Sequence, residues 1–316
     1  MIDLLKSNGK FYKANLHCHT TVSDGKMTPE QVKEQYVKQG YSIVAFTDHN
    51  KYEYHEHLKD DNFLPIGGVE IDFQIFDQNG KRENLRTCHL NFYAKDPKNV
   101  SAFEIHPAYN VLLINRYIEK MTKNGWLCTL NHPAWSLQPT NDVVEINNIT
   151  AMEVYNHLSQ IIANNGHSQD YYFSYLASGK KTYAVSTDDA HCIASPNGTA
   201  VDVGGGYIQI SMPSLTYENF IDAFSNGRFY ASSGVEIKEL YIDEETDELV
   251  ISCSPVASII TKGATTMNPH VLSPNGDITY ARMPMRKIRD AHKHYFRLEF
   301  LTLDGKQAYT QPYYFE

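Results

Sequence analysis

The sequence predicts an α/β fold: a barrel built from seven short β-strands, followed by a small all-β domain. Three observations lead to this prediction. Short apolar and β-branched runs recur through the first two thirds of the chain, and helix-like stretches separate several of them. Residues that alternate in a β-type pattern then dominate the end of the chain. Repeated βα units build a mostly parallel sheet, and seven of them favour a closed or nearly closed barrel.

The seven runs that we interpret as barrel strands are residues 14–19, 41–47, 63–71, 87–93, 126–130, 151–155 and 182–186. Amphipathic stretches predict helices at residues 28–39, 109–123 and 168–178. The first of these begins with Thr28-Pro29, which is typical of an N-cap followed by a first-turn proline. The resulting order is strand then helix.

Polar stretches between these elements predict excursions from the barrel. Residues 72–87 carry a turn signal at 77–81 and are interpreted as a hairpin-like insertion, whereas 156–166 and 193–206 are interpreted as loops over the barrel mouth. After residues 227–234 the βα pattern ends. Segments 236–241, 248–253 and 295–303 then show the alternating pattern of β-strands. We therefore predict a barrel domain over residues 1–230 and a β-sandwich over 231–316.

Composition limits the class of protein. The chain has 316 residues, of which 42% are hydrophobic, and no apolar run approaches the length of a membrane span. A net charge of -9 argues against general coating of nucleic acid. Five cysteines form an odd set without framework spacing, and the N-terminus lacks a signal-peptide pattern, which together favour the cytoplasm.

Residue types that bind metals recur where the predicted strands end. In His17-Cys18-His19 the two imidazoles project to one face of an extended chain and the thiol to the other, so the triplet is a potential two-ligand clamp. The further members of the series are Asp24, His49, Glu70, His89, His132, Asp189 and His191. In a βα barrel the carboxyl ends of the strands carry the chemistry, so position and residue type agree.

These residues lie in a sequence that resembles the polymerase and histidinol phosphatase (PHP) family. The resemblance rests on the motifs NLHCHTTVSDG at 15–25, FTDHN at 46–50, GVEI at 68–71, CHL at 88–90, HP at 132–133 and DAH at 189–191. The β-rich tail is similar to the branch with a C-terminal β-domain, which includes carbaryl-hydrolase-like proteins.

The resemblance implies a distorted seven-stranded β/α barrel that holds two to three divalent metal ions. It implies a first metal on His17, His19 and Asp189 with Glu70 as a bridge, a second completed by His89 and His132, and a third on Asp24, His49 and His191. Imidazole and carboxylate ligands suit Zn, Mn or Fe. The expected nucleophile is a hydroxide that bridges the metals, so no serine or cysteine nucleophile is needed.

Two ligand assignments have competitors. Asp188 stands beside Asp189, and the D-x-H spacing favours Asp189 as the ligand. His106 could take the role of His89, although His89 fits a strand better. The thiol of Cys18 is predicted to pack in the barrel wall.

Further residues are candidates for catalysis and substrate binding. We assign catalytic roles to His191 and to Asp48, the latter as a residue that orients ligands. Trp135 could stack on a flat substrate group or pack beneath a loop, and His157 follows a strand end. Arg86 is a candidate phosphate partner. Lys51 and Arg228 are alternatives to it.

The sequence thus predicts a metal-dependent phosphoesterase that acts on a phosphate ester of a small molecule or nucleotide. A carbamate or carboxylic ester hydrolase with the same metal centre, and a non-catalytic metal-stabilised binding module, remain alternatives. The basic run at 282–297 favours a solvated face over a grip on short oligonucleotides. No membrane partner is expected, and the oligomeric state is left open.

Overall fold

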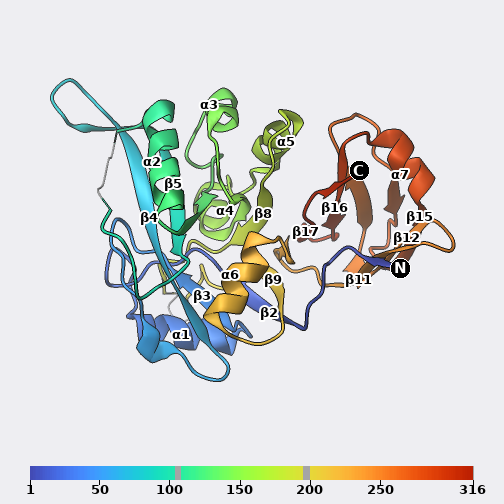
Figure 1. Ribbon diagram of the computed structural model, residues 1–316, viewed down its shortest axis with the longest axis horizontal. Coiled ribbons are helices and arrows are strands. Elements are labelled where there is room, and N and C mark those ends of the chain that lie inside the picture. Colours follow the sequence, from blue (N-terminus) through green and yellow to red (C-terminus); the bar gives the residue numbers. More distant parts are fainter. Residues whose placement is uncertain (104–107, 195–199, 316) are drawn as a thin grey trace.

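A computed structural model describes residues 1–103, 108–194 and 200–315 (Figure 1). The strands that correspond to the seven predicted runs are β2 (Lys10–Asn15), β3 (Ile43–Phe46), β4 (Leu64–Phe76), β5 (Arg82–Ala94), β6 (Trp126–Leu130), β7 (Ala151–Asn156) and β8 (Tyr183–Thr187). Their order in the sheet follows their order in the chain. The mixed α/β fold that the sequence predicts is confirmed.

The central sheet is mixed rather than uniformly parallel. Strands β2, β3 and β4 are parallel neighbours, and so are β6, β7 and β8. Strand β5 runs antiparallel to both β4 and β6, because β4 and β5 form the hairpin predicted for residues 72–87. The hairpin projects from the sheet at the upper left of Figure 1.

The closed barrel is not confirmed, because β8 forms no ladder with β2. Strand β9 (Tyr207–Met212) pairs antiparallel with β2 and occupies the edge that β8 would need. Beyond the end of β2 the chain comes back to the β8 side, where Cys18 and Ala190 form an isolated parallel bridge. The sheet is therefore open between β2 and β8, although the isolated bridge of Cys18 and Ala190 joins the segments that follow these two strands.

The helices are α1 (Pro29–Lys38), α2 (Val111–Lys123), α3 (Thr140–Glu145), α4 (His157–Ala163), α5 (Gln169–Ala177), α6 (Tyr217–Ser225) and α7 (Met285–Ala291), with a short 3-10 turn at η1 (Glu56–Leu58). Thr28 caps α1 in a reciprocal capping box with Gln31. The prediction that 156–166 is a loop is wrong, because α4 begins there. The Asn156 side chain accepts from the Ser159 amide and caps this helix.

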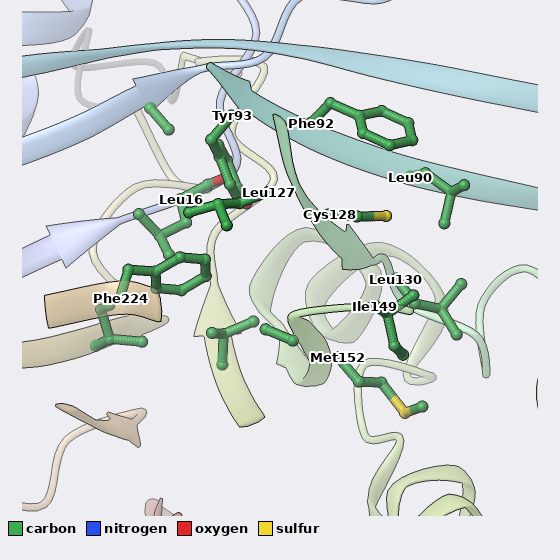
Figure 2. Close-up of a cluster of buried hydrophobic side chains, with 14 of the residues drawn as sticks. Leu16, Leu90, Phe92, Tyr93, Leu127, Cys128, Leu130, Ile149, Met152 and Phe224 are labelled. Atoms are coloured by element: carbon green, nitrogen blue, oxygen red, sulfur yellow. The ribbon is translucent and has the colours of Figure 1, made fainter. Parts of the chain in front are cut away.

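A large apolar core fills the space between the central sheet and its helices. Figure 2 shows side chains of this core from β5, β6 and β7, and the ring of Phe224 on α6 lies 5.7 Å from that of Tyr93 on β5. The labelled residues are Leu16, Leu90, Phe92, Tyr93, Leu127, Cys128, Leu130, Ile149, Met152 and Phe224. Each fully buried leucine or phenylalanine contributes about 1.5–3 kcal/mol through removal of apolar surface from water. The packed core holds the strands in place and so fixes the positions of the residues at the strand ends.

A second apolar cluster belongs to the C-terminal part of the chain. Its strands are β10 (Phe229–Ser232), β11 (Ile237–Asp243), β12 (Glu248–Val256), β13 (Ser258–Lys262), β14 (His270–Leu272), β15 (Ile278–Pro284), β16 (Tyr295–Leu301), β17 (Gln307–Tyr309) and β18 (Tyr313–Tyr314). Strand β1 (Ile2–Asp3) pairs with β11, so the start of the chain also joins this part. The separate cluster supports a boundary near residue 231, which we retain as a proposal.

The two parts nevertheless share one sheet. Strand β10 pairs with β9 on one side and with β17 on the other, which makes the C-terminal strands continuous with the central sheet. Within the described ranges, none of the helices has both the length and the apolar character needed to cross a membrane.

Candidate metal centre

The strand ends bring the predicted ligands to one place. His17 and His19 follow β2, His49 follows β3, and Asp189 follows β8. A bridge between His49 and Glu70 and the bridge between Cys18 and Ala190 hold these segments in register. Asp189 and His132 adopt positive backbone φ angles of 55° and 25°, a conformation that costs free energy and is often found at functional sites.

The most compact group consists of His17, His19, Glu70 and Asp189. The Nε2 atoms of His17 and His19 are 3.1 Å apart. Oδ1 of Asp189 lies 3.1 Å from the first and 3.2 Å from the second. Glu70 approaches the same two nitrogens with different oxygens, at 3.2 Å and 3.3 Å. The side chains of the two histidines and Glu70 are almost completely buried.

Glu70 also joins this group to three other histidines. Its Oε1 lies 3.0 Å from Nδ1 of His89 and 3.6 Å from Nε2 of His132. Its Oε2 lies 3.1 Å from Nδ1 of His49. A carboxylate with both oxygens shared in this way fits the bridging position expected for Glu70.

A third group forms on the solvent side of His19. The imidazoles of His49 and His191 each stack on His19, with ring centroids at 4.4 Å and 4.3 Å. Nε2 of His191 lies 3.4 Å from the half-exposed carboxylate of Asp24. These residues offer ligand atoms close enough together to hold one ion.

Asp48 fixes the loop that carries Asp24. Its buried carboxylate accepts from the backbone and hydroxyl of Thr20, at 2.8 Å and 2.9 Å. It accepts in the same way from Ser23, at 3.0 Å and 2.7 Å. With these four bonds Asp48 acts on the site through the loop, and it belongs to none of the potential ligand groups in the described residues.

Glu153 on β7 orients the central histidine. Nδ1 of His17 lies 2.7 Å from Oε1 of Glu153. Because a carboxylate only accepts, that nitrogen must donate, and Nε2 of His17 keeps its lone pair for the cluster when the ring is neutral. Glu153 also accepts from the His132 amide at 2.9 Å and from the Thr187 hydroxyl at 2.6 Å. One buried carboxylate therefore ties together the segments that carry two of the ligands.

The electrostatics of the cluster favour positive charge. Burial opposes a proton on His17, but the surrounding carboxylates, Asp189 first, raise the pKa of His17 well above its ordinary value. The same balance raises the pKa of His19 to about 9. Burial opposes ionisation of Glu70, yet His17 and the neighbouring histidines hold the pKa of Glu70 well below its ordinary value. A bound divalent cation would take the place of these protons.

The donor set fits divalent metals by geometry as well as by charge. Ligand atoms about 2.0–2.2 Å from an ion lie roughly 2.8–3.6 Å from one another at octahedral or tetrahedral angles. The central separations of 3.1–3.2 Å fall in this range. Among the described residues, buried Nδ1 of His19 and Nε2 of His89 lack a hydrogen-bond partner, which leaves donor atoms free for an ion.

A cavity of about 570 Å³ opens above this cluster. Trp135, half-buried, forms part of its wall and lies edge-on to His89 and His132, with ring centroids at 5.8 Å and 5.0 Å. Asp72 and Arg82 line the cavity as well. The cavity thus has imidazoles and carboxylates at its floor, and an aromatic side chain and a guanidinium on its wall.

Comparison with known proteins assigns the family. The profile of the PHP domain matches residues 15–210, which is more than half of the chain and includes every residue of the cluster. The chain belongs to the PHP family. Together with the potential ligand groups, membership supports a metal-dependent hydrolase.

Individual relatives of this PHP protein are distant. A 5′-3′ exoribonuclease of Haemophilus influenzae is 27% identical over 117 residues, which cover 36% of this chain and 41% of the relative. The chain thus aligns with less than half of that enzyme. A two-domain protein of Bacteroides vulgatus, which contains a predicted PHP-like metal-dependent phosphoesterase, is similar over 99% of this chain and 97% of its own, at 16% identity and a TM-score of 0.48. A candidate metal-dependent phosphoesterase of Bifidobacterium adolescentis covers 60% of this chain and 91% of its own, at 13% identity and a TM-score of 0.41.

Two of the substrate-binding candidates lie away from the metal cavity of this PHP protein. The ring of His157 packs against Gly205, and its Nδ1 bonds the Tyr155 hydroxyl at 3.0 Å, while the next residues, Leu158 and Ser159, line the cavity. Arg86 lies over the Tyr109 ring beside a neighbouring hollow.

The alternative phosphate partners are held elsewhere. The Lys51 ammonium bonds the Val22 carbonyl, and Arg228 pairs with Asp222. Arg82, which the sequence reasoning did not single out, is the arginine that lines the metal cavity. It is exposed in a hairpin, and only the folding of that hairpin brings it to the cavity.

The structure explains Asp188, the competitor of Asp189. Its buried carboxylate accepts from the amides of Gly204, Gly205 and Gly206 at 2.7–2.9 Å, so it anchors the triglycine segment. Burial raises the pKa of Asp188 to about 7, although these bonds oppose the shift. His106, the competitor of His89, lies outside the described residues.

Sequence reasoning missed Glu153. The only signal was an acidic residue inside the otherwise apolar run 151–155, which is unusual for a strand with a buried pattern. The prediction that Cys18 packs in the core agrees with its burial in an apolar cluster with Val32, Tyr36 and Ala190.

Proposed function

We propose that this protein is a phosphoesterase that cleaves a phosphate ester of a small molecule or nucleotide with two to three divalent metal ions, Zn, Mn or Fe. One observation supports the proposal most strongly. His17, His19, Glu70 and Asp189 present ligand atoms at the mutual distances that a metal ion requires, and Glu70 and Asp189 also line an open cavity. A purely structural site would instead be closed by protein ligands on all sides.

The proposed ligands are those of the sequence analysis. His17, His19, Asp189 and Glu70 would hold one ion, Glu70 with His89 and His132 a second, and Asp24, His49 and His191 a third. His49 also approaches Glu70, so it contacts the proposed ligands of the second ion as well as those of the third. When bound, such ions lower the pKa of water and stabilise negative charge on phosphoryl oxygens.

Other residues would position these groups and the substrate. Glu153 holds the His17 ring in the tautomer that binds through Nε2. The Ser136 hydroxyl lies 3.0 Å from Nδ1 of His132 and directs Nε2 of that ring towards Glu70. Asp48 holds the Asp24 loop, and Trp135 offers a flat face or edge to the leaving group. The five free, buried cysteines suit a reducing compartment, and we propose the cytoplasm.

The test compares substrate classes on a single metal-loaded preparation. Protein reconstituted with Mn or Zn should hydrolyse p-nitrophenyl phosphate, lose that activity on chelation and regain it when metal is restored. The matched substrates are p-nitrophenyl acetate and an aryl carbamate. Faster turnover of these at equal metal content would favour the ester-hydrolase alternative. Inactivity on all three classes with full metal content would favour a binding module.

A further inference from the structure

A second hollow adjoins the metal cavity. It has a volume of about 280 Å³ and lies between the β4–β5 hairpin and the loop that follows His132. Arg82 and Trp135 line both spaces, so the hollow and the cavity share a wall. A molecule whose ester lies over the ligand cluster could therefore extend past Trp135 into the hollow.

A bulge in the hairpin forms this hollow. Gln74 pairs with Thr87, but the next residue of β4, Ile75, pairs with Glu83, so residues 84–86 are extra on β5. Bulges redirect side chains and are common beside active sites. The Thr87 amide donates to the Ser136 carbonyl at 3.1 Å, which fixes the bulge against the loop that carries Trp135.

The chemistry of the hollow differs from that of the cavity. Two guanidinium groups, Arg82 and Arg86, line it against one carboxylate, Glu83. In the described part of the chain neither arginine forms an ion pair, and Arg86 is placed over the Tyr109 ring with 5.3 Å to the centroid. By contrast, the arginines of the basic run near the C-terminus are paired, for example Arg282 with Asp243.

The remaining wall of the hollow is apolar and accessible. Leu85 and Leu137 are 62% and 61% exposed, and both lie on the hollow beside Trp135. A leaving group with an apolar or aromatic body could cover these side chains. Its anionic end would then meet the two guanidiniums, which bind phosphate and carboxylate well.

We infer that the hollow is a second subsite, which selects phosphate esters whose leaving group itself carries an anionic group. The inference rests on the proposed function, because it takes the scissile phosphate to lie over the ligand cluster. Arg82 and Arg86 are the specificity-determining residues, and Leu85, Trp135 and Leu137 support the body of the leaving group. The anionic group is a phosphate or a carboxylate.

Three aryl phosphates test the inference. Phenyl phosphate has a neutral leaving group, 3-carboxyphenyl phosphate carries a carboxylate, and 3-(phosphonomethyl)phenyl phosphate carries a phosphonate that cannot be hydrolysed. We expect kcat/KM to be about tenfold higher for at least one anionic substrate than for phenyl phosphate, as one accessible charge-assisted hydrogen bond provides. The comparison of the carboxylated with the phosphonated substrate shows whether the subsite prefers a carboxylate or a phosphate group.

Matched variants locate the effect. In Arg82→Gln/Arg86→Gln the ratio of kcat/KM for anionic to neutral substrate should fall towards one, whereas Arg82→Lys should keep part of it. Arg286→Gln, which removes an 87% exposed arginine from α7, is the control and should leave the ratio unchanged. A wild-type ratio of one or less for both anionic substrates, or a full ratio in the double variant, would overturn the inference.

A binding measurement separates this inference from the proposed function. If the metal-loaded protein hydrolyses none of the three esters, calorimetry with phenylphosphonate and 3-carboxyphenylphosphonate still reports on the subsite. Tighter binding of the carboxylated ligand, lost in the double variant, would support the subsite although the reaction is a different one. Equal binding of both ligands would contradict it.

Discussion

The Gln311 side chain pairs with the backbone of Ala184 as a neighbouring strand would. Its Oε1 accepts from the Ala184 amide at 2.7 Å, and its Nε2 donates to the Ala184 carbonyl at 3.0 Å. Ala184 lies on β8, at the edge of the central sheet that β9 prevents from closing. A residue from the C-terminal part thus satisfies two buried backbone groups at the open edge of the metal-binding part.

Replacement of Gln311 should therefore destabilise the protein. In Gln311→Ala two buried backbone groups of Ala184 lose their partner, and we expect the free energy of unfolding to fall by about 2 kcal/mol. Urea unfolding followed by circular dichroism measures the change. The control Gln78→Ala removes an exposed glutamine from the hairpin turn and should stay within about 0.5 kcal/mol of wild type. Equal stability of the two variants would show that water replaces Gln311 at the edge.

Metal content should depend on Glu70 more than on Asp48. Wild-type protein should purify with at least two equivalents of Zn, Mn or Fe by elemental analysis. Glu70→Gln should lose most of this metal, because Glu70 lies within reach of five histidines. Asp48→Asn should lose less, since Asp48 acts only through the Asp24 loop. An active wild-type protein without transition metal would contradict the proposed ligand roles.

Glu153→Gln tests whether the orientation of His17 matters. Glu153 accepts a hydrogen bond from Nδ1 of His17, whereas a glutamine at this position can also present an N–H donor there. The bond is then weaker, and the His17 ring is no longer held in the tautomer with its proton on Nδ1. We expect metal affinity to fall roughly 10–100-fold, the range found when such supporting carboxylates are removed. Competition with a chromophoric chelator measures the affinity. Glu145→Gln, an exposed control on α3, should bind metal like wild type.

The metal-free protein should lose stability as the pH rises from about 6.5 to about 9. His19 has its pKa raised from 6.5 to about 9 in the folded state, so the folded protein holds this proton more tightly than the unfolded chain. The resulting stabilisation is complete below about 6.5 and disappears as the pH passes through about 9. Urea unfolding of chelator-treated protein across this range checks the direction.

Metal should reverse this pH dependence. Metal binding requires neutral imidazoles and releases protons, so affinity and metal-dependent stability should increase over the same pH range. His19→Gln should flatten the profile of the metal-free protein, while His270→Gln, an exposed histidine of β14, should leave it unchanged. A metal-free profile that rises between pH 6.5 and 9 would mean that the carboxylates do not hold the His19 proton.

Local sequence determined the strands and most of the proposed ligands. The seven apolar runs became the seven central strands because each run is long and apolar enough to be buried. His17, His19, Glu70 and Asp189 could be found because a parallel arrangement brings the ends of strands to one edge. The helix over 157–163 was missed because its short, mixed pattern resembles a loop, and Asn156 as its cap carries little information alone.

Tertiary structure decided which groups support the centre and whether the sheet closes. Glu153 contacts His17 across 136 positions of the chain, Arg82 reaches the cavity through a bulged hairpin, and Gln311 meets an edge 127 positions away. None of these contacts has a local pattern, because they depend on which strand edges are already paired. The sequence by itself therefore determined which residues stand at the strand ends. Only the fold, through the pairing of β9 with β2, decided that the sheet stays open and that Gln311 of the C-terminal part bonds its free edge at β8.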